Sequence, residues 1–140
     1  MARKPTILCV DDRAENLLVR KLMLEQFGCK VVAVNDSRAC VKALSEGPVD
    51  LVLIAYHLDE ATNGEDLARQ IRKERPALPL IMLTGDPKIP DSVRESVDAV
   101  LIKGAGSPKD LLDLIQDLVP DATLRTRPDQ VVPGTTPNAP

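Results

Sequence analysis

VDLVLIAYHLD, residues Val49–Asp59, carries the clearest structural signal of the sequence. Its centre, Leu51–Ala55, is an uncharged apolar run without polar alternation, which is typical of a strand buried on both faces of a parallel sheet. The run leads into Tyr56 and His57, the only tyrosine and the only histidine of the chain. Because ligands of open α/β sheets bind just beyond the carboxyl ends of the strands, we expect any functional site at residues 55–59.

Short apolar runs alternate with helical patterns on both sides of this stretch, and glycine, proline and capping residues separate them. Because crossovers between parallel strands are right-handed, the alternation predicts a doubly wound α/β fold. We expect a flavodoxin-like five-stranded parallel sheet of order 2-1-3-4-5 with five helices. The predicted strands are Thr6–Val10, Lys30–Val34, Leu51–Ala55, Leu80–Leu83 and Asp98–Ile102; the predicted helices are Ala14–Phe27, a helix capped by Asn35, Asp36 or Ser37 and ending at Glu46, Glu65–Arg75, Pro87–Ser96 and Pro108–Val119.

The first helical pattern carries one apolar stripe, and the composition changes after the last helix. The stripe, which we expect to be the buried side of the helix, consists of Ala14, Leu17, Leu18, Leu22, Met23 and Phe27. From Pro120 onward the chain is rich in proline and has no period, which favours disorder. We therefore expect a single domain over residues 1–119 and a disordered tail over residues 120–140.

Charge and cysteine content narrow the class of protein. The 140 residues include 18 Lys and Arg against 21 Asp and Glu, a net charge of −3 that argues against a nucleic-acid-binding surface. No apolar run is long enough to span a membrane, and the start of the chain does not have the pattern of a signal peptide. Cys9 and Cys40 lie in predicted elements and Cys29 directly precedes one, so buried, reduced thiols in a cytoplasmic protein are expected.

Polar residues stand at the carboxyl ends of several predicted strands. Asp11 and Asp12 follow the first strand, Thr84 follows the fourth, and Lys103 follows the fifth. In the predicted fold they gather on one rim around the end of the third strand. The acidic pair could hold a divalent cation, and the hydroxyl and ammonium groups could bind a phosphoryl group. Between them stands Ala55, which brings no reactive group.

These motifs, in this order and spacing, resemble the receiver domain of two-component response regulators over Thr6–Val119. The resemblance implies that a histidine kinase transfers a phosphoryl group to an aspartate at the end of the third strand. It also implies that the acidic pair binds Mg²⁺, that Thr84 follows the phosphoryl group and that Lys103 pairs with it. Since the acceptor position falls on Ala55, the chain resembles a receiver without its phosphoacceptor, a pseudo-receiver.

Three further positions depart from the pattern of that family. Val100 and Leu101 stand where the family usually has an aromatic switch residue, and Gly104 stands where it usually has a proline. A glycine there removes the reason for a cis peptide bond in that turn. The resemblance therefore supports the fold more strongly than the usual phosphotransfer.

Two other residues come into question as substitutes for the missing acceptor. Asp59 could swing in from its loop, although a solvated loop carboxylate is the simpler interpretation. His57 could be phosphorylated, although we expect its carbonyl to lie near the place of the family's backbone metal ligand.

The missing carboxylate also affects the predicted cation site. We expect only weak Mg²⁺ binding by Asp11, Asp12 and His57, and no other cofactor. Lys103 can instead pair with one of the two aspartates and offset their mutual repulsion. Thr84 and Lys103 are accordingly interpreted as relics of a phosphate site.

Two classes of function remain, and neither is enzymatic. The first is a signalling protein that acts by phosphorylation-independent protein–protein interaction, with a sensor histidine kinase or another signalling protein as partner. The second is a receiver that is phosphorylated in its native form or on another residue, with Ala55 an introduced or bypassed substitution. The resemblance also implies a possible homodimer through the fourth helix, fifth strand and fifth helix. A flavin- or nucleotide-binding protein is disfavoured, because no glycine-rich loop follows the first strand.

Overall fold

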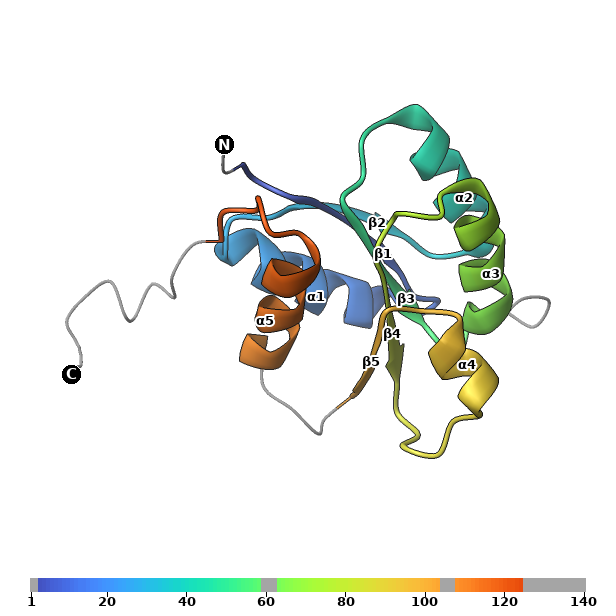
Figure 1. Cartoon of the computed structure of the whole chain (residues 1–140). Coiled ribbons are helices and arrows are strands. Elements are labelled where there is room, and N and C mark those ends of the chain that lie inside the picture. Colours follow the sequence, from blue (N-terminus) through green and yellow to red (C-terminus); the bar gives the residue numbers. More distant parts are fainter. Residues whose placement is uncertain (1–2, 59–62, 104–107, 125–140) are drawn as a thin grey trace.

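The computed structural model describes residues 3–58, 63–103 and 108–124 of the chain. Within these ranges five strands and five helices alternate along the sequence (Figure 1). The strands are β1 (Thr6–Val10), β2 (Lys30–Val34), β3 (Leu51–Ala55), β4 (Leu80–Thr84) and β5 (Ala99–Ile102). The helices are α1 (Ala14–Gln26), α2 (Ser37–Glu46), α3 (Gly64–Glu74), α4 (Asp91–Glu95) and α5 (Pro108–Leu118).

The five strands form one parallel sheet in the order β2-β1-β3-β4-β5, which confirms the predicted fold class. Figure 1 shows α1 and α5 on one face of the sheet and α2, α3 and α4 on the other. All five strands run in the same direction, so their carboxyl ends share one edge. The residues predicted to form a site follow the strands at this edge.

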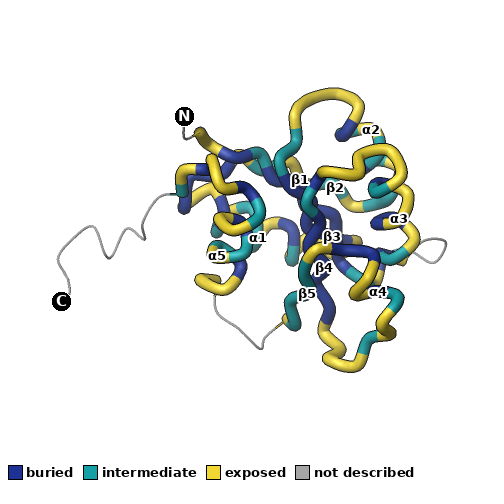
Figure 2. Tube along the Cα trace, in the orientation of Figure 1, coloured by how far each residue is buried: buried dark blue, intermediate teal, exposed yellow. Residues whose placement is uncertain are grey.

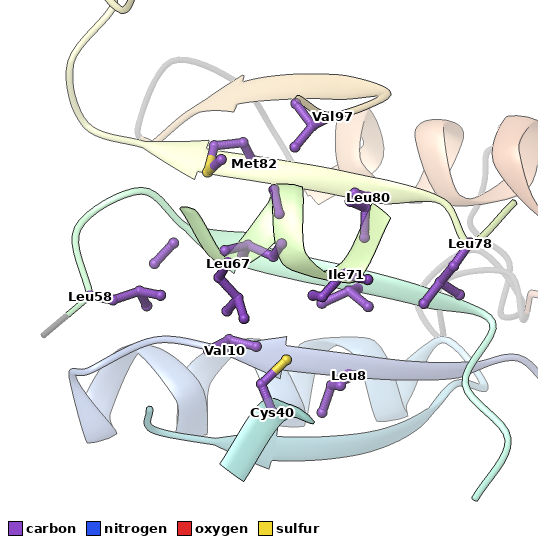
Figure 3. Packing of buried hydrophobic residues seen from close by; sticks show 14 of the residues in the cluster. Leu8, Val10, Cys40, Leu58, Leu67, Ile71, Leu78, Leu80, Met82 and Val97 are labelled. Carbon is purple, nitrogen blue, oxygen red and sulfur yellow. The ribbon is translucent and has the colours of Figure 1, made fainter. Parts of the chain in front are cut away.

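Each face of the sheet has its own apolar core. The strands at the centre are buried, whereas the outer sides of the helices are exposed (Figure 2). Because side chains alternate across a strand, successive residues of β1, of β4, and of β3 as far as Ile54 enter opposite cores. The core beneath α2, α3 and α4 includes Leu8, Val10, Cys40, Leu67, Ile71, Leu80 and Met82 (Figure 3). The core beneath α1 and α5 includes Ile7, Cys9, Leu24, Leu53, Ile81 and Ile115.

Local capping explains where several elements begin and end. Asp36, one of the three predicted caps, accepts a hydrogen bond from the Ala39 amide at 2.7 Å at the start of α2. Asn63 caps α3 in the same way, accepting from the Asp66 amide at 2.9 Å. After α1, Gly28 adopts a φ of 94°, the left-handed conformation that glycine tolerates best.

The predicted buried stripe of α1 is wrong in part. Leu18 and Leu22 are 57% and 59% exposed, and Val19 beside them is 68% exposed. The buried residues of the helix are Leu17 and Leu24. These two lie seven residues apart on one side of the helix, and a polar residue interrupts the line between them. The neighbouring line with Leu18 and Leu22 has no such interruption, so the sequence pattern favoured it as the buried side, although it faces outward.

Two other boundaries differ from the expected ones. α4 covers Asp91–Glu95 and not the whole of Pro87–Ser96, because Pro90 caps the helix and lacks the amide that would continue it backward. Past Val119, Ala122 is buried and forms an isolated parallel bridge with Arg3. The packed part of the chain thus continues a few residues beyond the domain boundary expected at residue 119.

The three cysteines are free and buried, as the sequence predicts. Burial raises the pKa of the Cys9 and Cys40 thiols to about 12 and that of Cys29 to about 11. Such thiols are protonated and unreactive at neutral pH. Within the described residues, no helix combines the length and the apolar character needed to cross a bilayer.

Candidate functional site

The register of the sheet places Asp11, Ala55 and Leu83 side by side at the carboxyl edge. Val10 of β1 pairs with Ile54 of β3, so the next residues, Asp11 and Ala55, are neighbours. Ala55 pairs in turn with Leu83 of β4. We call four residues at the strand ends here the rim: Ala55 and Thr84, the last residues of β3 and β4, and Asp11 and Lys103, which directly follow β1 and β5. Polar residues thus gather at this edge, and Ala55 lies between them.

Asp11 is the buried acid of the rim, with an exposed fraction of 1%. Its Oδ1 accepts a hydrogen bond from the Arg13 backbone amide at 3.0 Å. Its Oδ2 faces Asn16 Nδ2 at 3.4 Å, Arg20 Nη1 at 3.5 Å and Lys103 Nζ at 3.5 Å. These three contacts are long for hydrogen bonds, so in the two contacts with Arg20 and Lys103 charge attraction contributes more than hydrogen-bond geometry. We call the side chains of Asp11, Asn16, Arg20 and Lys103, together with the Arg13 amide, the Asp11 corner.

The net effect of this environment is to keep Asp11 ionised. Burial acts to raise its pKa, but the Arg13 amide, Lys103, Arg20 and Asn16 act in the opposite direction and outweigh it. The pKa of the carboxyl therefore lies below its ordinary value. At neutral pH the Asp11 corner contains one carboxylate and two cationic side chains.

Arg20 is the site residue that the sequence pattern did not reveal. Its side chain is 13% exposed and reaches Asp11 from the inner side of α1. Arg20 lies three residues after Leu17 and four before Leu24, which puts it on the buried line of the helix. This spacing could have identified Arg20 as a site residue, because an arginine within a buried line of a helix needs a buried partner.

Ala55 is 1% exposed, and tight packing surrounds its backbone. Gly64, the first residue of α3, donates its amide to the Tyr56 carbonyl at 2.8 Å. A Cβ atom on Gly64 would lie 2.5 Å from the Ala55 carbonyl oxygen and 2.9 Å from Met82 Sδ. The start of α3 therefore lies directly against the end of β3. We call Ala55, Tyr56, Gly64 and Met82 the Ala55 corner.

The two predicted phosphate-site residues are both on the rim, but each already has partners. Thr84 is buried, and its hydroxyl accepts from the Asp86 amide at 3.1 Å and lies 3.4 Å from the Asp86 carbonyl oxygen, to which it donates. Lys103 donates its amide to the Thr84 carbonyl at 2.7 Å. Its ammonium group pairs with Asp11, one of the two aspartates expected from the sequence.

The other candidates are not drawn into the Asp11 corner. Asp12 is exposed. His57 is also exposed, and its ring packs edge-on against Tyr56 with 4.9 Å between the ring centroids. Asp59 lies outside the described residues, as does Gly104.

The rim as arranged does not fit a Mg²⁺ ion. Ala55 offers no side-chain oxygen, and both oxygens of Asp11 already face donors. Among the described residues, no group of three or more His, Cys, Asp or Glu side chains is placed to hold a metal ion. Because Mg²⁺ requires near-octahedral oxygen coordination, this set of groups is unsuited to it.

The fold and rim together define a class of signalling domain. The chain belongs to the response regulator receiver domain family, whose model matches residues 7–116. It is therefore a receiver domain of the kind found in two-component response regulators.

Curated relatives are much longer proteins that share this part. The sensor histidine kinase GacS of Pseudomonas protegens is 36% identical over 87 residues, which cover 59% of this chain and 10% of GacS. The transcriptional regulatory protein GlrR of Escherichia coli is 34% identical over 101 residues, covering 71% of this chain and 22% of GlrR. The match thus spans less than a quarter of either relative.

Solved structures of receiver domains show the same fold at lower sequence identity. The signal receiver domain of an HD domain-containing protein from Pseudomonas fluorescens Pf-5 superposes with a TM-score of 0.74 at 27% identity, covering 85% of this chain and 98% of that one. The CheY-like receiver domain from Methanospirillum hungatei JF-1 gives a TM-score of 0.75 at 27% identity, covering 84% and 95%.

Proposed function

We propose that this receiver domain signals by protein–protein contact without being phosphorylated, and that it is not an enzyme. The observation that carries the proposal is Ala55 at the carboxyl end of β3, in one row with Asp11. A methyl group has no lone pair with which to attack phosphorus. Lys103 and Asp11, which the resemblance assigns to phosphoryl and metal binding, pair with each other instead.

Two surfaces support contact with a partner. On α1, Leu18, Val19 and Leu22 are each more than half exposed, and such neighbouring apolar side chains are characteristic of protein-binding surfaces. Away from α1, β5 is one of the two edge strands of the sheet, and all four of its residues are partly exposed. We propose the face formed by α4, β5 and α5 as a homodimer surface.

The proposed partner is a sensor histidine kinase or another signalling protein, because curated relatives include a sensor histidine kinase. We propose that this contact takes place in the cytoplasm. The proposed partners include neither nucleic acid nor a membrane surface. The net charge of −3 supports the omission of nucleic acid.

A second candidate is a receiver that is phosphorylated in its native form or on another residue, with Ala55 introduced or bypassed. The presence of Thr84 and Lys103 at the ends of β4 and β5 favours it. In this case, restoring the carboxylate by Ala55→Asp would restore phosphorylation.

Intact-mass measurement tests the proposal directly. The protein is incubated with acetyl phosphate and Mg²⁺, and its mass is compared with that of an untreated sample. We expect no added phosphoryl mass. A stoichiometric phosphoryl adduct on the wild-type chain would rule out the phosphorylation-independent function and favour the second candidate.

A further inference from the structure

Arg20 has a charge and a position that the packing of α1 does not require. The residue lies between Leu17 and Leu24 on the buried line of the helix, where an apolar side chain would satisfy the core. Placing a guanidinium group there is unfavourable unless an anion compensates it. The compensating anion is Asp11, whose Oδ2 lies 3.5 Å from Arg20 Nη1.

The charge balance of the Asp11 corner shows what Arg20 adds. Lys103 alone would already neutralise the single buried carboxylate, since its Nζ also lies 3.5 Å from Oδ2. With Arg20 the corner carries two positive charges against one negative charge. A divalent cation bound to Oδ2 would therefore lie beside both of these groups, and like charges at so short a separation repel strongly.

We propose that Arg20 is a built-in cation that takes the place of a divalent metal at Asp11, so that this receiver excludes Mg²⁺ by charge. Arg20 is a positioning residue in this account, because it acts through Asp11. The proposal goes beyond the missing acceptor at Ala55. Restoring a carboxylate at position 55 leaves Arg20 in place, so the repaired rim would still bind metal poorly.

Metal titration of variants that all carry a restored carboxylate isolates the contribution of Arg20. Mn²⁺ serves as the probe, and the free ion is measured by its electron paramagnetic resonance signal. The three proteins are Ala55→Asp, Ala55→Asp with Arg20→Met, and Ala55→Asp with Lys21→Met. Lys21 is the matched control, since it lies on the same helix but pairs with Glu25 on the surface.

We expect Ala55→Asp with Arg20→Met to bind Mn²⁺ about 10- to 100-fold more tightly than Ala55→Asp alone, the range found when groups beside metal ligands are changed. The Lys21 control should bind like Ala55→Asp alone. The wild-type protein should show no binding at Mn²⁺ concentrations that saturate the Arg20→Met double variant. Adding Mg²⁺ should release the bound Mn²⁺.

Equal affinity of Ala55→Asp with and without Arg20→Met would overturn the proposal, as would an equal gain from Lys21→Met. Saturable Mn²⁺ binding by the wild-type protein would also overturn the proposal. If the methionine double variant does not fold, Arg20→Gln in the same background keeps a hydrogen-bond donor without the charge and should bind tightly. Arg20→Lys keeps the charge and should bind weakly.

Discussion

Asp11 and Ala55 are neighbours in one row of the sheet, yet their surroundings differ in kind. The side chain of Asp11 is surrounded by an amide, a side-chain amide and two cations. Ala55 has only a methyl group, and the backbone at the start of α3 lies against its carbonyl group. The Asp11 corner is therefore held by charge, and the Ala55 corner by close packing.

This contrast explains why the rim contains a buried acid at Asp11 next to an alanine at the end of β3. The side chain of an alanine has no polar atom that would need a partner when buried, so the fold tolerates it at the end of β3. Removing Asp11 would instead leave Arg20 buried without its counter-ion. The structural role of Asp11 is thus sufficient to explain its presence, independent of metal binding.

The largest expected effect comes from removing the acid of the Asp11 corner. Asp11→Ala should lower the free energy of unfolding by about 3 kcal/mol, because the buried partner cation loses its anion. Asp12→Ala is the control: Asp12 is exposed, so its loss should cost less than about 0.5 kcal/mol. Chemical denaturation measures both. Equal losses would show that the burial of the charge pair contributes nothing.

A single methyl group added at Gly64 should disrupt the close packing of the Ala55 corner. Gly64→Ala places Cβ 2.5 Å from the Ala55 carbonyl oxygen, and such overpacking costs about 1–3 kcal/mol. Gly85→Ala, also at the carboxyl edge, has no atom within 4 Å of the added Cβ and should change stability by less than about 0.5 kcal/mol. If Gly64→Ala were as stable as the wild-type protein, α3 would not be packed closely against β3.

A smaller effect is the pH dependence of stability, which the Asp11 corner should contribute and the Ala55 corner should not. The pKa of Asp11 is lowered in the folded protein, so its charge stabilises the fold fully above the ordinary Asp pKa of about 3.9. This contribution is lost as the pH falls through the lower folded pKa. The stability advantage of the wild-type protein over Asp11→Asn should therefore be constant above about pH 5 and shrink in acid.

Denaturation of both proteins between neutral and acidic pH measures this difference. The pKa of Asp50 is also lowered, chiefly by its hydrogen bond with Arg3, but Asp50 is present in both proteins and its effect cancels. An advantage that grew as the pH fell would mean that the folded-state pKa of Asp11 is raised, contrary to its cationic surroundings.

The fold could be predicted from the sequence because its signals are local. The buried run at Leu51–Ala55, the cap at Asp36 and the glycine at Gly28 each act within a few residues. The strand ends then placed Asp11 and Lys103 correctly on one rim. Topology alone brings strand-end residues together in this way, whatever their side chains do.

The remaining features of the site depend on contacts between elements, which a pattern within one element does not reveal. Arg20 looked like an interruption of the apolar line of α1, because its partner Asp11 belongs to another element. The need for glycine at Gly64 arises from the carbonyl oxygen of Ala55 on β3. His57 suggested chemistry by its rarity, whereas its ring is exposed beside Tyr56.

The most direct test of the account is an amide NMR titration of the wild-type protein with Mg²⁺ and beryllofluoride, which mimics a phosphoryl group on a carboxylate. The amide signals of Thr84 and Lys103 report on the rim. We expect that they do not move in a saturable manner, because Ala55 offers no carboxylate and Asp11 is already paired with two cationic side chains. Saturable shifts of these signals would contradict it.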